Sequence, residues 1–528
     1  MDIPHVFVTL GDVTHVECDA WMLPSDIRYS VTEGWFATVP TLRGRIKASQ
    51  ADDFTFGKVL ATPIVGWNDG LPLPILSAVP FGGLRTDDDV IELGKAVRDF
   101  VRVGAEQARK RQPQPRRTKH LLAMPSFGTA GGGGQLKRGE VLQVLLNEVK
   151  AASANHDVDV VIVLRDERTF ALAQQLRKLS ANTWEDLDVK LLSKAKELAS
   201  KARDGKLVPF MGAGVSVSAG GPTWGELIRG LAVGVGLAQS NVDSLVDSKR
   251  DALDQAAYLR ELYRQRNPDL VDGGFGEAVA KAVQLDRYGL APALLASLRT
   301  EQAITLNYDT LFELAARDAH DARTVIPSDG ADTASDKWLL KLHGSVSRPD
   351  SIVLTRDDYL GYSANREALS AIVKANLITH HLLFVGFGLA DDHFHQIIHD
   401  VRRALPETHE RGEFATALTM RHDPLDEILW NGQLKLVPMG PAGGAIRAAG
   451  RRLEIFLDAL LAHATDSHSY LLHKDFASSL EKDEEELRRK VLAFTETIEP
   501  QDRAVPAWGL IERMLEALGG NGVEAARR

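Results

Sequence analysis

The sequence predicts an α/β protein, with a layered domain over residues 1–180, a doubly wound parallel sheet over residues 181–466 and a helical extension over residues 467–528. Three observations lead to this prediction. Strand and helix signals alternate through the first segment, short continuous apolar runs recur through the second, and the apolar run Leu207–Met211 leads directly into a glycine turn.

Apolar runs in the first segment predict strands, and longer patterns with one polar face predict helices. The expected strands are Val6–Leu10, Ala20–Leu23, Pro74–Val79, Leu121–Pro125 and Val158–Leu164, and the expected helices lie near Asp88–Arg111 and Arg138–Ala152. A polar helical stretch, Trp184–Asp204, then leads through Gly205 into the second segment. The junction between the two domains is therefore expected near Gly205.

The second segment contains short apolar runs without alternation, as expected for parallel strands that are covered on both faces. The expected strands are Leu207–Met211, Ala303–Leu306, Leu339–Leu342, Ile352–Leu354, Leu382–Val385, Ala415–Met420 and Lys435–Val437. A long helical insert, about Trp224–Arg299, separates the first two. The charged, helical residues after about Ser467 are expected to form a solvated helix or an oligomer contact.

Composition narrows the functional classes. Apolar residues make up 44% of the 528 residues and charged residues 25%, and no apolar stretch reaches the length that spans a bilayer, so no membrane partner is expected. The formal charge of −10 argues against direct binding of nucleic acid, because phosphate contacts need clustered Lys and Arg. The start of the chain has no signal segment, which predicts a cytoplasmic protein.

Cys18 is the only cysteine of the chain. A single cysteine excludes an intrachain disulfide and every zinc site built from several cysteines, so no metal is expected. His393 and His395 are spaced i, i+2, which on a helix places them on different faces. We therefore interpret both histidines as structural residues.

The glycine turn at Gly212 and Gly214 follows an apolar run and precedes a helix start. Glycines allow a tight turn and a close approach by a pyrophosphate, and the following helix offers free N–H groups and the positive end of its dipole. The turn predicts a dinucleotide-phosphate site. Taken alone, it is more typical of an ordinary connection between a strand and a helix than of a phosphate site.

Three further motifs follow expected strands. They are Thr305–Asp309 (TLNYD), Lys341–Ser345 (KLHGS) and Gly386–Gly388 (GFG). Open parallel sheets bind ligands beyond the carboxyl ends of their strands, so all three motifs and the glycine turn are expected to meet in one crevice.

From about residue 205 to 465 the chain resembles the sirtuin family, and in particular the bacterial sirtuin-like NAD hydrolases of anti-phage defence. The ordered motifs GAGVS, LNYD, KLHGS, VLTRDDY and VGFGLADDH carry this resemblance. It implies a Rossmann-like fold with NAD as the substrate, Asn307 beside the nicotinamide ribose and His343 as the general base. The cofactor-binding residues that it implies are Gly212, Ala213, Gly214, Ser216, Thr223, Trp224, Asp309, Gly386 and Gly388.

The chemistry of the residues agrees with those roles. Cleavage of the nicotinamide glycosidic bond forms an oxocarbenium-like ribose and a neutral leaving group, so catalysis needs a group titrating near neutrality and an amide that holds a water. His343 and Asn307 supply these two groups. Asp309 is a candidate to hold the nicotinamide amide or to orient Asn307, and Ser216 is a candidate donor to phosphate or ribose.

Two departures from protein-deacylating sirtuins predict hydrolysis rather than deacylation. Deacylases carry a four-cysteine zinc ribbon after the His-Gly motif, whereas residues 344–385 contain no cysteine. Deacylases also continue the glycine turn to Pro-x-Phe-Arg, and here Pro222 is followed by Thr223 and Trp224. Water is therefore the expected acceptor, with ADP-ribose and nicotinamide as products.

The first domain resembles a macrodomain, the fold that binds ADP-ribose. Leu10–Thr14, Ala123–Gly132 and the strand Val160–Leu164 carry this resemblance. It implies that Asp12 accepts from an adenine amino group and that the glycine-rich loop, with Gly128 and Gly131, wraps a diphosphate. Consecutive glycines present bare N–H groups to phosphate, although a flexible surface loop would have the same composition.

The family context predicts a regulated anti-phage effector whose first domain senses ADP-ribose or a related nucleotide. An enzyme that empties the NAD pool must be silent at rest, so a homo-oligomeric switch is expected. Two alternatives remain open. One is a scaffold that binds NAD or ADP-ribose without catalysis, and the other is an ADP-ribosyltransferase.

Overall fold

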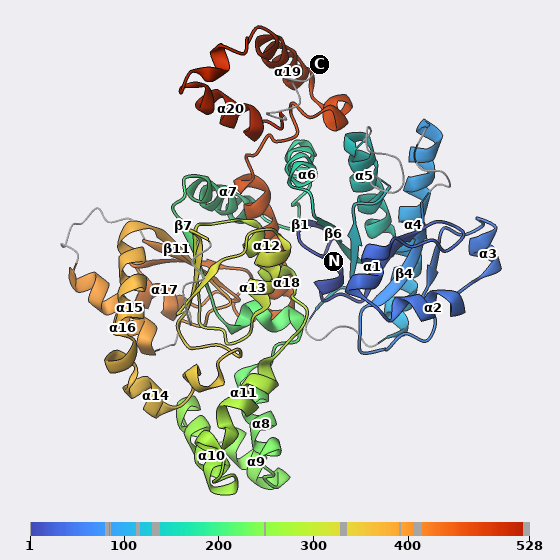
Figure 1. Ribbon diagram of the computed structural model, residues 1–528. Coiled ribbons are helices and arrows are strands. Elements are labelled where there is room, and N and C mark those ends of the chain that lie inside the picture. Colours follow the sequence, from blue (N-terminus) through green and yellow to red (C-terminus); the bar gives the residue numbers. More distant parts are fainter. Residues whose placement is uncertain are drawn as a thin grey trace. The chain divides into compact units, whose positions relative to one another are not determined.

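The computed structural model describes residues 2–79, 84, 86–111, 117–128, 138–247, 250–327, 335–389, 392–404 and 414–520. The chain divides into two compact units (Figure 1). The first comprises residues 1–114, 119–196 and 458–528, and the second comprises residues 115–118 and 197–457. Residues 467–528, expected as a separate extension, thus belong to the same compact unit as the N-terminal residues.

The first unit contains a six-stranded sheet in the order β1-β6-β5-β2-β4-β3. Its strands are β1 (Val6–Leu10), β2 (Ala20–Ser25), β3 (Ala61–Pro63), β4 (Leu73–Ala78), β5 (Leu121–Pro125) and β6 (Asp159–Leu164). β3 runs antiparallel to β4, and the other pairs are parallel. Every residue of β4 and β6 is buried, as expected for strands that are covered on both faces.

The helices of the first unit lie between and after these strands, and α7 continues from the first unit into the second. They are α1 (Glu33–Thr38), α2 (Leu42–Ala48), α3 (Asp52–Thr55), α4 (Asp87–Lys110), α5 (Arg138–His156), α6 (Glu167–Leu179), α7 (Val189–Arg203), α19 (Lys482–Glu496) and α20 (Trp508–Ala517). α4 begins with a capping box, in which Thr86 and Asp89 satisfy each other's free N–H groups.

The second unit contains a seven-stranded parallel sheet in the order β13-β12-β11-β7-β8-β10-β9. Its strands are β7 (Leu207–Met211), β8 (Gln302–Thr305), β9 (Thr324–Ile326), β10 (Trp338–Lys341), β11 (His381–Val385), β12 (Ala415–Thr419) and β13 (Leu434–Pro438). The chain extends from β7 to β8 on one side and later adds β11 on the other side, so β7 lies at the topological switch point. The expected doubly wound parallel sheet is confirmed.

The expected helical insert between β7 and β8 comprises α8 (Trp224–Gly234), α9 (Gln239–Val246), α10 (Ala252–Arg266), α11 (Phe275–Val283) and α12 (Leu290–Ser297). In Figure 1, α8–α11 form a helical cluster of their own beside the sheet. Its core includes Leu231, Leu259 and Val279. The remaining helices are α13 (Leu311–Asp318), α14 (Arg356–Leu360), α15 (Tyr362–Thr379), α16 (Asp392–Ala404), α17 (Pro424–Trp430) and α18 (Ile446–Ala464).

The prediction of a strand at Ile352–Leu354 is wrong. These residues are buried but irregular, and Ile352 and Leu354 pack into the core of the helical cluster. Two three-residue strands, β3 and β9, had no clear signal in the sequence, because each is too short to show a period. Among the described helices, none has both the length and the apolar composition needed to cross a bilayer.

Candidate functional site

A cavity of about 490 Å³ lies at the carboxyl ends of the central strands of the second sheet. Gly212 follows β7, Asn307 follows β8, His343 follows β10 and Gly386 follows β11. The cavity is lined by Gly212, Ala213, Ser216, Gly221, Pro222, Trp224, Leu227, Val283, Leu306, Asn307, Tyr308, Asp309, His343, Tyr359, Gly386, Phe387 and Gly388. The four motifs therefore meet at the switch point, where open parallel sheets bind ligands.

The glycine turn is shaped by close contact with the loop after β11. A Cβ atom on Gly212 would lie 2.6 Å from the Gly386 carbonyl oxygen, and one on Gly214 would lie 2.7 Å from the Gly386 Cα. The Gly212 amide donates to Val385 O and the Gly214 amide donates to Gly386 O, both at 2.9 Å. These glycines are thus required for loop packing, and their amides are bonded to the last residue of β11 and to the first residue of the loop after it.

The segment after the glycine turn differs from the expected α-helix. Residues Ala213–Ala219 form a 3-10 helix, and α8 begins only at Trp224. Thr223 is the N-cap of α8 and forms a capping box with Glu226. Thr223 therefore has a structural role at the helix start, while the neighbouring Trp224 lines the cavity.

Asn307, Ser216 and Asp309 form a hydrogen-bonded chain across the floor of the cavity. The Asn307 Nδ2 donates to Ser216 Oγ at 3.1 Å, and Ser216 Oγ donates to Asp309 Oδ2 at 2.8 Å. The other carboxylate oxygen of Asp309 accepts from the Leu311 amide at 3.1 Å. This chain orients the Asn307 amide, because its nitrogen is committed to Ser216.

Two polar atoms of the described cavity lining are buried without a hydrogen-bond partner. They are the Asn307 Oδ1, an acceptor, and the Trp224 Nε1, a donor. Most buried polar atoms in folded proteins have a partner, so an unsatisfied donor and acceptor in one cavity favour a bound polar ligand. A ribose hydroxyl, an amide or a water would satisfy them.

His343 lies at the end of β10 and is only 5% exposed. Its ring makes edge contacts with Tyr359 and Tyr362, at centroid distances of 5.4 and 6.2 Å. The following Gly344 has φ +91°, and a Cβ atom there would lie 2.2 Å from Ser351 O, so only glycine allows this turn. Tyr359 also lines the cavity but was not predicted as a site residue, although it ends the VLTRDDY motif.

Within the described residues, no group of three or more His, Cys, Asp or Glu side chains is arranged to hold a metal ion. His395 hydrogen-bonds through Nε2 to Leu389 O at 2.8 Å, and its ring packs against Trp430. The side chain of His393 lies outside the described part of the chain.

In the first unit, Asp12 and Gly128 both follow carboxyl ends of strands, β1 and β5. Asp12 caps a short 3-10 helix through the Thr14 amide, at 3.0 Å, and pairs with Arg165. Its carboxylate is therefore already engaged. Gly128 has φ +83° and packs against leucine side chains. The predicted site residue Gly131 lies outside the described residues.

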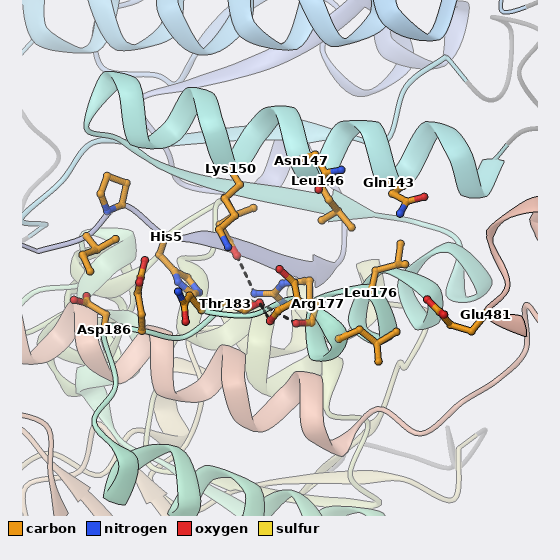
Figure 2. A pocket seen from close by; sticks show the side chains of 17 residues that line it. His5, Gln143, Leu146, Asn147, Lys150, Leu176, Arg177, Thr183, Asp186 and Glu481 are labelled. Carbon is orange, nitrogen blue, oxygen red and sulfur yellow. Dashed lines mark hydrogen bonds between the residues drawn. The ribbon is translucent and has the colours of Figure 1, made fainter. Parts of the chain in front are cut away.

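A different cavity, of about 280 Å³, lies in the first unit beside α5 and α6 (Figure 2). His5, at the amino end of β1, and Arg177, on α6, lie in its wall, with Leu146 and Leu176 as apolar lining. It differs from the predicted nucleotide site, because Asp12 and Gly128 lie at the opposite, carboxyl ends of the strands.

The doubly wound parallel sheet and the cavity at its switch point define an α/β protein of Rossmann-like architecture, the class in which ligands bind at this position of the sheet. More specifically, residues 301–434 match the model of the SIR2-like domain. The resemblance to sirtuins is thus confirmed by a family match over these residues. The macrodomain resemblance of the first unit stays a prediction.

Three relatives show similarity to part of the chain. Defense-associated sirtuin 2 of Bacillus subtilis is 27% identical over 45% of this chain and 23% of its own length. The NAD(+) hydrolase ThsA of Enterococcus faecium is 29% identical over 42% of this chain and 45% of its own. ThsA of Bacillus cereus (strain MSX-D12) is 27% identical over 41% and 44%, respectively. The match thus spans less than half of each relative.

Proposed function

We propose that the second unit hydrolyses NAD to ADP-ribose and nicotinamide. The observation that carries the proposal is the Asn307 Oδ1, which is buried without a partner in a cavity that His343 also lines. An oriented acceptor beside a histidine is the arrangement that a water-activating site needs. The relatives named NAD(+) hydrolase support the same activity.

In the proposed reaction, the bond between the nicotinamide nitrogen and the ribose C1′ breaks, and nicotinamide leaves as a neutral molecule with the electron pair of that bond. Water adds to C1′, and its proton passes to His343 and then to solvent. Asn307 Oδ1 accepts a hydrogen bond from this water or from a ribose hydroxyl. Burial of the cavity strengthens both interactions.

The rest of the cavity would hold the remainder of NAD. The loop glycines Gly386 and Gly388 have no side chain and Ala213 has only a methyl group, so this wall would allow the diphosphate and adenosine to approach the backbone closely. The buried N–H of Trp224 is a donor for a polar group of the ligand, and Asp309 acts through Ser216 on Asn307. Asp309 is thus better placed to orient Asn307 than to contact nicotinamide.

Turnover of NAD by purified protein tests the proposal. His343→Ala and Asn307→Ala are each expected to lower kcat by about 100-fold or more, because each removes a group that contacts the reacting water. His422→Ala and Asn241→Ala are matched controls outside the cavity lining and are expected to keep wild-type turnover. Wild-type protein that binds NAD without cleaving it would favour a scaffold, and label transferred from NAD to protein would favour an ADP-ribosyltransferase.

We also propose that the protein acts in the cytoplasm as a regulated anti-phage effector and works as a homo-oligomer. The relative named defense-associated sirtuin supports the role in defence. The first unit would bind ADP-ribose or a related nucleotide at the carboxyl ends of β1 and β5, where Asp12 and Gly128 lie. Calorimetric titration of the full chain with ADP-ribose is expected to show a site that Asp12→Ala removes and His343→Ala retains.

A further inference from the structure

Lys341 is a lysine buried beneath the candidate site, with a side chain only 1% exposed. It is the last residue of β10, two positions before His343. Its ammonium group donates to Glu313 Oε1 at 2.6 Å and to the Asp309 carbonyl at 2.5 Å, and it lies 3.4 Å from the Tyr308 carbonyl. The side chain thus connects the strand that carries His343 to the segment that carries Asn307.

The segment that carries Asn307 leaves the sheet after Thr305, the last residue of β8. The backbone hydrogen bonds between β10 and β8 continue one step beyond the strands, where Leu342 N donates to Thr305 O at 3.0 Å. They resume where Val346 N donates to Tyr308 O at 2.8 Å. Between these two bonds the chain carries Asn307 into the cavity. Lys341 supplies donors to backbone carbonyls in the interval where the regular ladder is interrupted.

Glu313, on α13, offsets the cost of burying the Lys341 ammonium group by accepting its hydrogen bond. Burial raises the pKa of Glu313, and the charge of Lys341 opposes this rise. A buried ion pair is by itself weak evidence for stability, since well-packed apolar residues of similar volume often stabilise a fold as well. What an apolar pair could not supply is the donation to the Asp309 and Tyr308 carbonyls.

We infer that Lys341, held by Glu313, is a positioning residue that sets the place of Asn307 relative to His343. This inference rests on the proposed NAD hydrolysis. Lys341 does not line the cavity, and it acts through the backbone of Tyr308 and Asp309. We call the contacts of Lys341 with Glu313 and with the Tyr308 and Asp309 carbonyls the Lys341 clamp. Because Asp309 also orients Asn307 through Ser216, this clamp holds the backbone of the segment as well as the side-chain amide of Asn307.

The test compares Lys341→Met with Lys337→Met in the full chain. Lys337 is a matched control, because it precedes the other end of the same strand and makes the same kind of contacts, with Asp321 at 2.6 Å and Arg299 O at 3.2 Å. Lys341→Met is expected to lower kcat for NAD by about 10- to 100-fold with a smaller change in KM, because misplaced reacting groups slow the chemical step. Lys337→Met is expected to keep the wild-type kcat.

Hydrogen exchange provides a readout that does not depend on turnover. Amides of residues 306–311 are expected to exchange faster in Lys341→Met and at the wild-type rate in Lys337→Met. Glu313→Gln is the milder variant if Lys341→Met does not fold. Its amide still accepts from Lys341, so we expect the kcat to fall less than in Lys341→Met and the same amides to exchange faster.

The outcomes separate this inference from the proposed function. If the wild type does not cleave NAD, the proposed hydrolysis fails and the catalytic inference fails with it. If the wild type cleaves NAD and the variants that fold keep its kcat and its exchange at residues 306–311, the clamp is disproved while the hydrolase stands. Equal losses of kcat in Lys341→Met and Lys337→Met would also overturn the inference about Lys341, because they would indicate general destabilisation of the fold.

Discussion

Asp458 in the first unit and Glu313 in the second are both buried carboxyl groups that pair with a cation, yet their pKa values shift in opposite directions. Burial alone raises the pKa of a carboxyl group, because it disfavours the charged form. The difference must therefore come from the groups that surround each carboxylate. The contacts of Asp458 are expected to stabilise the first unit, whereas the contact of Glu313 with Lys341 is inferred to position the candidate site.

Asp458 has donors on all sides. It is 0% exposed and accepts from Arg177 Nη1 at 3.0 Å, Arg177 Nη2 at 2.5 Å, His5 Nε2 at 2.9 Å, Trp184 Nε1 at 2.8 Å and the Val8 amide at 3.3 Å. Burial opposes ionisation of Asp458, but Arg177 and His5 outweigh it and hold its pKa well below its usual range. The carboxylate is thus a fixed anion that connects the C-terminal part of α18 to β1 and α6.

Glu313 has one cation, which it shares. Lys341 donates to the carbonyls of Tyr308 and Asp309 as well as to Glu313, and the nearby charge of Asp309 disfavours a second anion. Burial therefore prevails and raises the pKa of Glu313. Burial raises the pKa of both carboxyl groups, so the larger set of donors around Asp458 accounts for the opposite direction of its pKa shift.

Replacement of the Asp458 carboxylate is expected to have the largest effect on stability. Asp458→Ala leaves the buried guanidinium of Arg177 without a counter-charge, which costs about 3–5 kcal/mol. Native-state hydrogen exchange of the β1 amides measures this loss within the first unit. A loss below about 1 kcal/mol would show that the cluster does not stabilise this unit.

Removal of a single donor is expected to cost less. Trp184→Phe keeps an aromatic ring but removes the N–H that donates to Asp458 Oδ2, and a hydrogen bond to a charged group is worth about 1.5–3 kcal/mol. The same β1 amides provide the measurement. If Trp184→Phe were as damaging as Asp458→Ala, packing of the indole and not its hydrogen bond would be the main contribution.

From the opposite pKa shifts of Asp458 and Glu313 we predict opposite effects of pH on the free energy of unfolding. Each group contributes at most about 1.4 kcal/mol per pH unit. The folded-state pKa of Asp458 is lowered, so its stabilisation is present above its unfolded pKa of about 3.9 and is lost as the pH falls towards the folded-state value. The folded-state pKa of Glu313 is raised, so its stabilisation is present below its unfolded pKa of about 4.3 and is lost as the pH rises through the folded-state value.

Unfolding of matched amide variants at a series of pH values measures this contrast. Relative to the wild type, Asp458→Asn is expected to lose stability as the pH rises from about 2 to 4, and Glu313→Gln is expected to gain stability as the pH rises above about 4. The same sign for both variants would contradict the contrast between the two carboxyl groups.

Most strands could be predicted from the sequence because they are short apolar runs bounded by turn residues. β1, β5 and β7 begin and end at the predicted residues. Ile352–Leu354 has the same apolar character, but its residues pack against the helical cluster instead of pairing in the sheet. An apolar run indicates burial, and only the neighbours decide whether buried residues form a strand.

The candidate site was predictable to the extent that its motifs follow strands. Ser216, Asn307, Asp309, His343 and Gly386 all line the cavity, as the convergence of strand ends implied. The sequence could not show that Gly214 packs on Gly386, whereas the Thr223–Glu226 capping box has a local signature from which it could have been predicted. The role of Gly214 depends on a contact with a distant part of the chain, which no local pattern reports.

By itself, the sequence determined the candidate site residues, namely an amide, a histidine and glycine turns at the ends of apolar strands. It also determined that several strands are parallel and buried, because continuous apolar runs fit only a sheet that is covered on both faces. The tertiary structure decided the states of the buried charges. His5 and Asp458 lie 453 residues apart in the chain, and no local pattern reports a pairing that only folding creates.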